Sequence, residues 1–349
     1  MNFWRVVRRL WVLVVVTVAP FSASFVQAQE PLRIVTTTTQ ASDLVRVLTQ
    51  DIPNIALTPL MSAGVDPHLY QPTEADIVAM SQADVIIYSG LHLEGRFDAI
   101  FASLSEQGVP IVALSEAIER EGYTLEATGE VGVADPHFWF DPRNWQLATT
   151  ELARRLIQFV PEHSDKIIEN AIGYNNKLDF LYAWGSGAMA QVPEAQRYLV
   201  TSHDAFQYFG DAFGWQMVAI QGISTASEAG VGDIQGVVSF VIAQEIPVLF
   251  VESSVPINTI RAVQEAVKAQ GRDVQIGLRE LYSDAMGNEG EFGATYLGMM
   301  VSNIVTILAS YQAQGVELTL PEYPKGMPLP DEDDELLGWL NSLTKADKR

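Results

Sequence analysis

The 349-residue sequence contains no cysteine. This absence rules out disulfide bonds and metal sites built on thiolates. It also removes the residue that carries the lipid of a lipoprotein, so we expect a protein without a direct membrane anchor. Any metal bound by this chain must therefore be held by nitrogen and oxygen atoms.

Positive charge is also scarce: the chain has 21 Lys and Arg against 43 Asp and Glu, a formal net charge of -22. An acidic surface of this kind repels phosphate backbones and anionic lipids, so we expect no nucleic-acid partner. It would attract cations, although acidity also keeps an exported protein soluble. The charge thus excludes a class of partner without assigning a function.

Long apolar runs are confined to the amino-terminal region. Three arginines among residues 1–10 precede the apolar residues 11–25, and small residues follow up to Ala28. This order is typical of a secretory signal peptide, and the run is shorter than the roughly 18 to 20 residues that span a bilayer. We predict that residues 1–28 are a signal peptide and that the remaining protein is soluble in the periplasm.

The signals of two common functions are missing as well. No Gly-rich phosphate loop follows any predicted strand, and the sequence has no Gly-x-Ser-x-Gly elbow. These patterns normally accompany nucleotide binding and serine hydrolase chemistry. The sequence therefore supports neither function.

Short β-branched runs alternate with helical segments along most of the chain, which indicates parallel sheets flanked by helices. The roughly 320 residues left after cleavage exceed the usual size of one core. We therefore predict an α/β fold of two doubly wound, Rossmann-like lobes. The predicted strands cover residues 32–37, 55–60, 84–88 and 110–113 in the first lobe and 198–201, 215–219, 248–251 and 274–276 in the second.

The two lobes are expected to be joined by one long helix. Residues 162–190 keep helical periodicity without a proline, which would give a helix of roughly 40 Å. We predict an amino-terminal lobe over residues 29–160, a linker helix over 161–192 and a carboxy-terminal lobe over 193–320. Residues 321–349, rich in proline and acid, are expected to be a solvated extension without chemistry.

Three of the five histidines lie at or just after a predicted strand end, the edge of a doubly wound sheet where ligands bind. They are His68, His137 and His203. The first two belong to Asp-Pro-His tripeptides, in which proline holds the preceding aspartate extended. A single loop histidine is more often an ordinary polar residue, but the repeated tripeptide favours a preorganised ligand.

A fourth ligand is expected from the second lobe if both lobes share one ion. The candidate is Asp284, which follows the last predicted strand. Three imidazoles and one carboxylate would complete the coordination of a zinc ion at about 2.0 to 2.2 Å. The predicted site therefore holds one divalent ion between the lobes.

Over nearly all of its length after residue 28, the sequence resembles the periplasmic substrate-binding proteins of zinc/manganese ABC importers, the ZnuA/TroA-like cluster A-I metal-binding family. The resemblance implies that His68, His137, His203 and Asp284 occupy the family's four ligand positions. It further implies two α/β lobes on one long helix, a monomer, and an ABC permease with its ATPase as partners. The motifs that carry it are 65–73, 84–86, 90–94, 135–142, 222–225 and 281–284.

The identity of the metal stays open between Zn2+ and Mn2+. Many dedicated zinc binders of this family carry a histidine-rich loop, but residues 119–134 contain no histidine, which leaves manganese open. An imidazole-rich site suits zinc instead, and zinc outcompetes manganese at most nitrogen and oxygen sites. We expect one Zn2+ or Mn2+ as transported cargo, with Fe2+ less favoured.

Three acidic residues, Asp141, Glu228 and Glu252, are candidates to accept the second ring N–H of a ligand histidine. Acidic residues near strand ends are more often solvated, or cap a helix, than bonded to a ligand. His92 lies in a family motif where it is not a ligand, and His163 is expected at the start of the linker helix.

Two other functions use the same residues. A zinc hydrolase would keep an open position for water beside three protein ligands, and Asp284 as a fourth ligand removes that position. A metal-binding adhesin or sensor would have the same fold and site. We expect a non-enzymatic protein that captures a metal and delivers it to a transporter.

Overall fold

The structure is a computed structural model that describes residues 30–129, 131–332 and 334–344. The predicted signal peptide, residues 1–28, lies outside the described residues. Residues 31–349 form one contact unit, so the domain boundaries predicted above stay predictions. No helix in the described part of the chain has both the length and the apolar character needed to cross a bilayer.

The first lobe contains a four-stranded, fully parallel sheet with the order β2-β1-β3-β4. Because all four strands are parallel, their carboxyl ends lie at one edge of the sheet, and the chain turns to opposite sides of β1 there, the position where such sheets bind ligands. The strands are β1 Leu32–Thr36, β2 Ile55–Pro59, β3 Val85–Tyr88 and β4 Ile111–Ala113, and the helices are α1 Thr39–Leu48, α2 Glu74–Ser81, α3 Asp98–Glu106 and α4 Glu116–Glu121.

Helix α1 illustrates how the sequence produces these elements. The Thr38 side chain accepts a hydrogen bond from the Ala41 backbone N–H and so caps the helix. Ala41, Leu44, Val45 and Leu48 are fully buried at helical spacing. The buried face holds α1 against the sheet and directs its amino terminus toward the strand ends.

The second lobe repeats the arrangement with shorter strands. β5 pairs in parallel with β6 and β7 pairs in parallel with β8, and the Phe250 N–H donates to the Val200 carbonyl at 2.8 Å between the pairs. The elements are β5 Tyr198–Thr201, α7 Gln207–Phe213, β6 Gln216–Ala219, α8 Val231–Ala243, β7 Val248–Leu249, α9 Asn258–Ala269, β8 Gln275–Ile276 and α10 Tyr296–Ala313. The predicted α/β fold with two lobes is confirmed.

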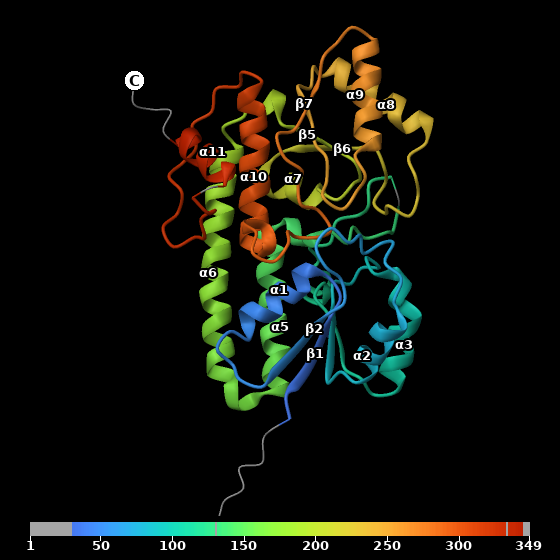
Figure 1. Ribbon diagram of the computed structural model, residues 1–349, viewed down its shortest axis with the longest axis vertical. Coiled ribbons are helices and arrows are strands. Elements are labelled where there is room, and N and C mark those ends of the chain that lie inside the picture. The colour runs from blue at the N-terminus through green and yellow to red at the C-terminus, as the bar shows by residue number, and fades with distance from the viewer. Residues whose placement is uncertain (1–29, 130, 333, 345–349) are drawn as a thin grey trace, which may run out of the picture. The chain divides into compact units, whose positions relative to one another are not determined.

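One long helix, α6, spans Ser164–Met189, close to the predicted residues 162–190. It follows α5, Pro142–Phe159, and it contacts α1 and α5 in the first lobe and α7 and α10 in the second. Figure 1 shows α6 beside α5 along one part of its length and beside α10 along the rest. A helix of 26 residues is roughly 39 Å long, so α6 can support both lobes as one rigid element.

The end of the chain corrects one prediction. Residues 321–349 were expected to be solvated, but helix α11, Glu335–Thr344, buries Leu336, Leu340 and Leu343 against the core that contains α10. These leucines recur at helical spacing directly after the acidic run, and burial of that apolar face holds the helix on the protein. The prediction of a solvated extension is therefore wrong for α11.

Candidate metal centre

The four predicted ligands meet in one place although they come from four separate segments. His68 lies between β2 and α2, and His137 immediately precedes the short 3-10 turn Phe138–Phe140. His203 follows β5, and Asp284 follows β8. One nitrogen or carboxylate oxygen from each side chain lies within 4.8 Å of those of the other three.

The distances between these atoms fit a tetrahedral ion. His68 Nε2 lies 3.3 Å from His137 Nε2, and His137 Nε2 lies 3.4 Å from Asp284 Oδ1. His203 Nε2 lies 3.3 Å from Asp284 Oδ2. A tetrahedral zinc ion with bonds of about 2.0 to 2.2 Å separates its ligand atoms by about 3.3 to 3.6 Å. Three of the six ligand pairs thus have tetrahedral spacing, two of them through different oxygens of Asp284, and all four ligand atoms lie within 4.8 Å of one another.

The cluster is shielded from solvent. His137 and His203 are 0 % exposed, Asp284 is 1 % exposed and His68 is 8 % exposed. A buried group of ionisable side chains is costly unless opposite charges are paired, and a divalent cation would provide that pairing. The burial of all four side chains therefore supports a site made for a cation.

The pKa values of His137, His203 and Asp284 are shifted by one another and by nearby carboxylates. Burial lowers the pKa of His137, but the carboxylates of Asp135 and Asp284 outweigh it and raise that pKa to about 9. Burial likewise opposes protonation of His203, whose pKa is nevertheless raised by Glu252 and Asp284. Against the effect of burial, His203 and His137 hold the pKa of Asp284 well below its ordinary value. Protons on these rings therefore occupy the positions that a metal would take.

The Asp-Pro-His tripeptides share one local geometry. Asp66 Oδ1 accepts the His68 backbone N–H at 2.8 Å, and Asp135 Oδ1 accepts the His137 backbone N–H at the same distance. Such a turn, in which an aspartate accepts a hydrogen bond from the second residue after it, fixes the backbone of the histidine. The repeated tripeptide thus builds two similarly held histidines.

Asp135 is a functional candidate that the sequence reasoning missed. Its Oδ1 also lies 2.8 Å from His137 Nδ1, and its side chain is 0 % exposed. Acceptance of the Nδ1 proton orients the ring so that Nε2 faces the other ligands. The tripeptide itself was the available signal, because its aspartate is adjacent to the turn that presents the histidine.

Of the three acidic residues predicted to orient a histidine, Glu252 lies at that position. Its Oε2 is 2.6 Å from His203 Nδ1, and its Oε1 accepts the His203 backbone N–H at 2.9 Å. Asp141 instead directly precedes α5, which begins at Pro142, and caps that helix by accepting the Arg143 N–H at 2.8 Å. Its carboxylate also pairs with the Arg143 guanidinium. Glu228 is exposed and, within the described residues, bonds to no histidine.

The other two histidines lie outside the cluster. His92 Nδ1 is 3.0 Å from Asp98 Oδ2, and both side chains are mostly exposed. His163 precedes the first residue of α6. Neither belongs to the group of side chains able to hold a metal ion.

Several hydrogen bonds connect the lobes around the cluster. Thr225 Oγ1 donates to Asp66 Oδ2 at 2.5 Å, and Gln40 Nε2 donates to the Asp284 carbonyl at 3.1 Å. Trp139 Nε1 donates to the Ser283 carbonyl at 3.3 Å. The residues beside His68, His137 and Asp284 are therefore bonded across the lobes. The position of one lobe against the other thus affects where these ligands lie.

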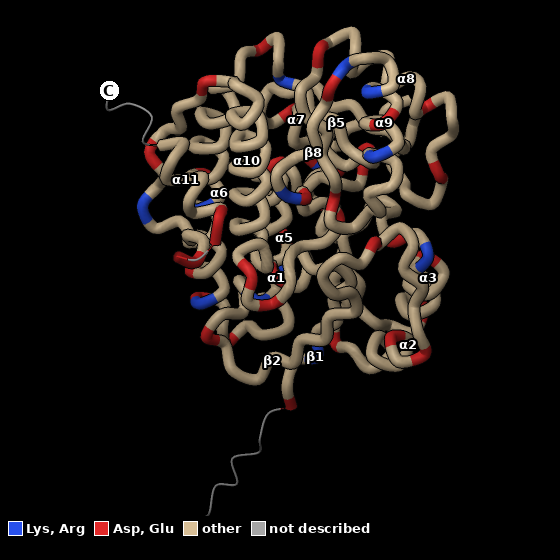
Figure 2. Tube along the Cα trace, turned by 45° about the horizontal axis from the view of Figure 1, so that its top comes forward, with Lys and Arg blue, Asp and Glu red and all other residues tan. Residues whose placement is uncertain are grey.

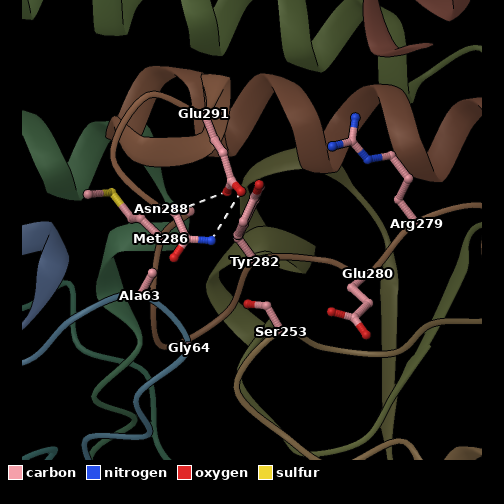
Figure 3. Close-up of a pocket in the computed structure, with 10 residues that line it drawn as sticks. Ala63, Gly64, Ser253, Arg279, Glu280, Tyr282, Met286, Asn288 and Glu291 are labelled. Carbon is pink, nitrogen blue, oxygen red and sulfur yellow. Dashed lines mark hydrogen bonds between the residues drawn. The ribbon is translucent and has the colours of Figure 1, made fainter. Parts of the chain in front are cut away.

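A cavity of about 450 Å³ adjoins the segments that carry His68 and Asp284. Ala63 and Gly64 line one side, and Figure 3 shows them opposite Ser253 and Tyr282 of the second lobe. Asn288 and Glu291, bonded to each other, complete the polar part of the wall. The cavity is large enough to hold water, and it lies next to the segments that carry His68 and Asp284.

Comparison with known proteins shows the family of this chain. A family model described as zinc-uptake complex component A, periplasmic (ZnuA), matches residues 34–310. The chain is 39% identical over 280 residues to the manganese-binding lipoprotein MntA of Bacillus subtilis, covering 80% of this chain and 90% of that protein. It is 38% identical over 277 residues to the zinc-binding protein TroA of Treponema pallidum, covering 79% and 88%.

A solved structure of the periplasmic zinc-binding protein TroA from Treponema pallidum has the same architecture. It superposes with a TM-score of 0.76 at 38% sequence identity and covers 81% of this chain and 99% of that chain. The chain therefore belongs to the ZnuA family, the periplasmic component A of zinc-uptake complexes.

Proposed function

We propose that this protein is the solute-binding component of an ABC importer, which captures one Zn2+ or Mn2+ between its lobes and delivers it to a membrane permease. The observation that carries the proposal is the convergence of three buried histidines and one buried aspartate, whose ligand atoms lie within 4.8 Å of one another. Two ligands come from each lobe, so binding of the ion joins the lobes. His68 and His137 belong to the first, and His203 and Asp284 to the second.

Capture accounts for the site better than catalysis. Four protein ligands complete a tetrahedral shell, whereas a catalytic zinc keeps an open position for water. The carboxylates next to the ligands are already engaged: Asp135 bonds to the ring of His137, and Glu252 accepts the His203 backbone N–H and lies at ion-pair distance from its ring. They would therefore serve to orient ligands and not as general bases for an attacking water.

Exchange of protons for metal gives the uptake step a chemical basis. The ion would displace protons from His137 and His203, whose pKa values are raised by neighbouring carboxylates. His68 needs no deprotonation near neutral pH because burial lowers its pKa to about 3. Release would follow when the permease separates the lobes or when protons return to the rings.

The chemistry favours zinc in a direct competition, since three imidazoles are a soft donor set compared with the oxygen ligands that suit manganese. The relatives' names divide between the two metals, with manganese for MntA and zinc for TroA. Cellular supply and the permease would then select the cargo. Acidic residues occur along the whole trace (Figure 2) and would attract either cation to the surface.

We further propose that the protein works as a soluble monomer in the periplasm after loss of residues 1–28. The absence of cysteine supports release from the membrane, because no thiol is present for lipid attachment. Its partners would be a permease and the ATPase that drives it.

The test is metal loading of the purified protein after removal of bound ions with a chelator. Zinc, manganese and iron are offered in competition, and the bound ion is identified by native mass spectrometry. One equivalent of zinc or manganese is expected. A variant in which alanine replaces His68, His137, His203 and Asp284 should bind none. If that variant retains one tightly bound equivalent, the proposal is wrong.

A further inference from the structure

The family match ends at residue 310, but the chain continues and folds back onto the protein. We infer that residues 314–332 and 334–344, here called the brace, hold the Asp284-bearing segment in its ligating position and so slow the release of metal. The segment concerned is residues 277–284, here called the ligand segment. The inference rests on the proposed function and adds a positioning role for residues beyond the matched region.

The brace is fixed to the protein at several separate points. Leu336, Leu340 and Leu343 are at most 3 % exposed, and the Leu320 N–H donates to the Leu343 carbonyl at 3.0 Å. The rings of Tyr323 and Trp184, a residue of α6, meet edge to face at 5.1 Å. Figure 1 shows α11 beside α6 and α10. The brace is thus fixed to the helices that support both lobes.

One ion pair joins the brace to the ligand segment. Arg279 Nη1 donates to Asp334 Oδ1 at 2.8 Å, with side chains 35% and 22% exposed. Asp334 Oδ1 also accepts the Leu336 N–H at 2.9 Å and thereby caps α11. The same carboxylate therefore orders the start of α11 and restrains Arg279, five residues before Asp284 in the chain.

The ligand segment is also anchored elsewhere: its Leu281 backbone bonds to Val251 and Ser253, its end bonds to the first lobe as described above, and three further bonds join it to α10. The Leu278 N–H donates to Ser310 Oγ at 3.0 Å. Asn303, which is 0 % exposed, accepts the Tyr282 N–H at 2.9 Å and donates to the Tyr282 carbonyl at 2.8 Å. The Arg279 pair lies between these two anchors, and α10 in turn packs against α11. The Arg279 pair therefore adds an outer restraint to a backbone that the other contacts hold near Asp284.

The alternative role for the brace is simply to cover apolar surface of the core. That role predicts a change in the free energy of unfolding when the brace is weakened, with no change in the metal site of the folded protein. A positioning role predicts altered coordination and faster release in protein that is still fully folded. The two roles therefore differ in what they predict for the bound metal.

The test breaks the ion pair in the full chain with Asp334→Asn. Asparagine caps a helix as well as aspartate does, so α11 keeps its first turn while the charge is lost. The matched control is Glu245→Gln, which removes the partner of Arg272, an exposed pair at 2.6 Å in the same lobe. Zinc release into excess chelator is followed by stopped flow, and the visible spectrum of the cobalt-loaded protein reports its coordination.

We expect Asp334→Asn to accelerate release about twofold to fivefold, as suits a half-exposed pair, and to change the cobalt spectrum. Glu245→Gln should change neither. Arg279→Gln, which breaks the pair from the other side and leaves the Asp334 cap of α11 intact, should accelerate release to the same extent. Wild-type rate and spectrum in Asp334→Asn, or equal acceleration in the control, would overturn the inference alone. A wild-type protein that takes up no metal would overturn the proposed function, and the inference with it.

Discussion

The two Asp-Pro-His tripeptides have the same sequence and the same backbone turn but opposite electrostatics. Burial lowers the pKa of His68 to about 3, whereas Asp135 and Asp284 raise the pKa of His137 to about 9 against the effect of burial. One source of the difference is the second hydrogen bond of each aspartate; Asp284 adds to it at His137, and burial dominates at His68. Asp135 reaches the ring of His137, while Asp66 turns its other oxygen toward Thr225 of the second lobe.

The comparison separates what a short motif determines from what the surrounding fold adds. The tripeptide places a histidine on a fixed backbone in both copies. The fold then makes His137 a ring that must lose a proton to bind metal, and His68 a ring that is already neutral. His137 is therefore the ring that carries charge before metal binds. The aspartate that holds His68 is itself bonded to Thr225 of the second lobe.

The largest expected effect is a difference between the two aspartates. Asp135→Asn removes the carboxylate that orients His137 and should weaken zinc affinity about 10-fold to 100-fold. Asp66→Asn should weaken it by less, because Asp66 contacts the backbone of His68 and not its ring. Competition with a chelator of known affinity measures both, and equal losses would contradict the distinction.

The second-largest expected effect is a dependence of metal affinity on pH. His137 has a pKa near 9, so a proton is bound below that pH and must leave when metal binds. Apparent affinity should therefore fall as the pH decreases below 9, by about tenfold per pH unit for each proton displaced. His68 should contribute no proton above about pH 4, since burial lowers its pKa to about 3.

An indicator dye in weakly buffered protein at pH 7 measures this release directly. We expect at least one proton per zinc bound. Asp135→Asn should reduce that number because it removes a carboxylate that raises the pKa of His137. Zinc uptake without proton release would show that His137 is neutral before binding and would contradict the assigned charge.

The smallest effect tests the contact between lobes. Thr225→Val removes the hydroxyl that donates to Asp66 and keeps the side-chain volume, so zinc release should accelerate about threefold to tenfold. Thr49→Val is a suitable control because the Thr49 hydroxyl donates to the Val45 carbonyl at the end of α1, within the first lobe. Stopped-flow release rates compare the two. Equal rates in both variants and the wild type would mean that this hydrogen bond does not restrain closure.

Local sequence patterns were sufficient for the four clustered residues and for most of the fold. His68, His203 and Asp284 each come after a β-branched run, and each run forms a strand that pairs in parallel with a neighbour in its own sheet. The ends of parallel strands are where ligands bind in such folds, so the pattern marked the candidates. The long helix was predictable because its periodic apolar face has no proline to interrupt it. These features depend on neighbours within a few residues.

The errors arose where neighbours in space decide the outcome. Asp141 was considered a partner of a histidine, although Asp followed by Pro is also the start of a helix, which is its role here. The leucines of α11 were missed because the acidic run before them suggested solvent. Asp135 was missed because its bond to a ring depends on where the tripeptide lies in the fold.

The central claim is that three imidazoles and one carboxylate surround a single ion, and X-ray absorption at the zinc edge of the zinc-loaded protein tests it most directly. We predict four nitrogen and oxygen ligands at about 2.0 to 2.1 Å, with the multiple scattering of three imidazoles. A six-coordinate, water-rich shell, or fewer than three imidazoles, would contradict the account.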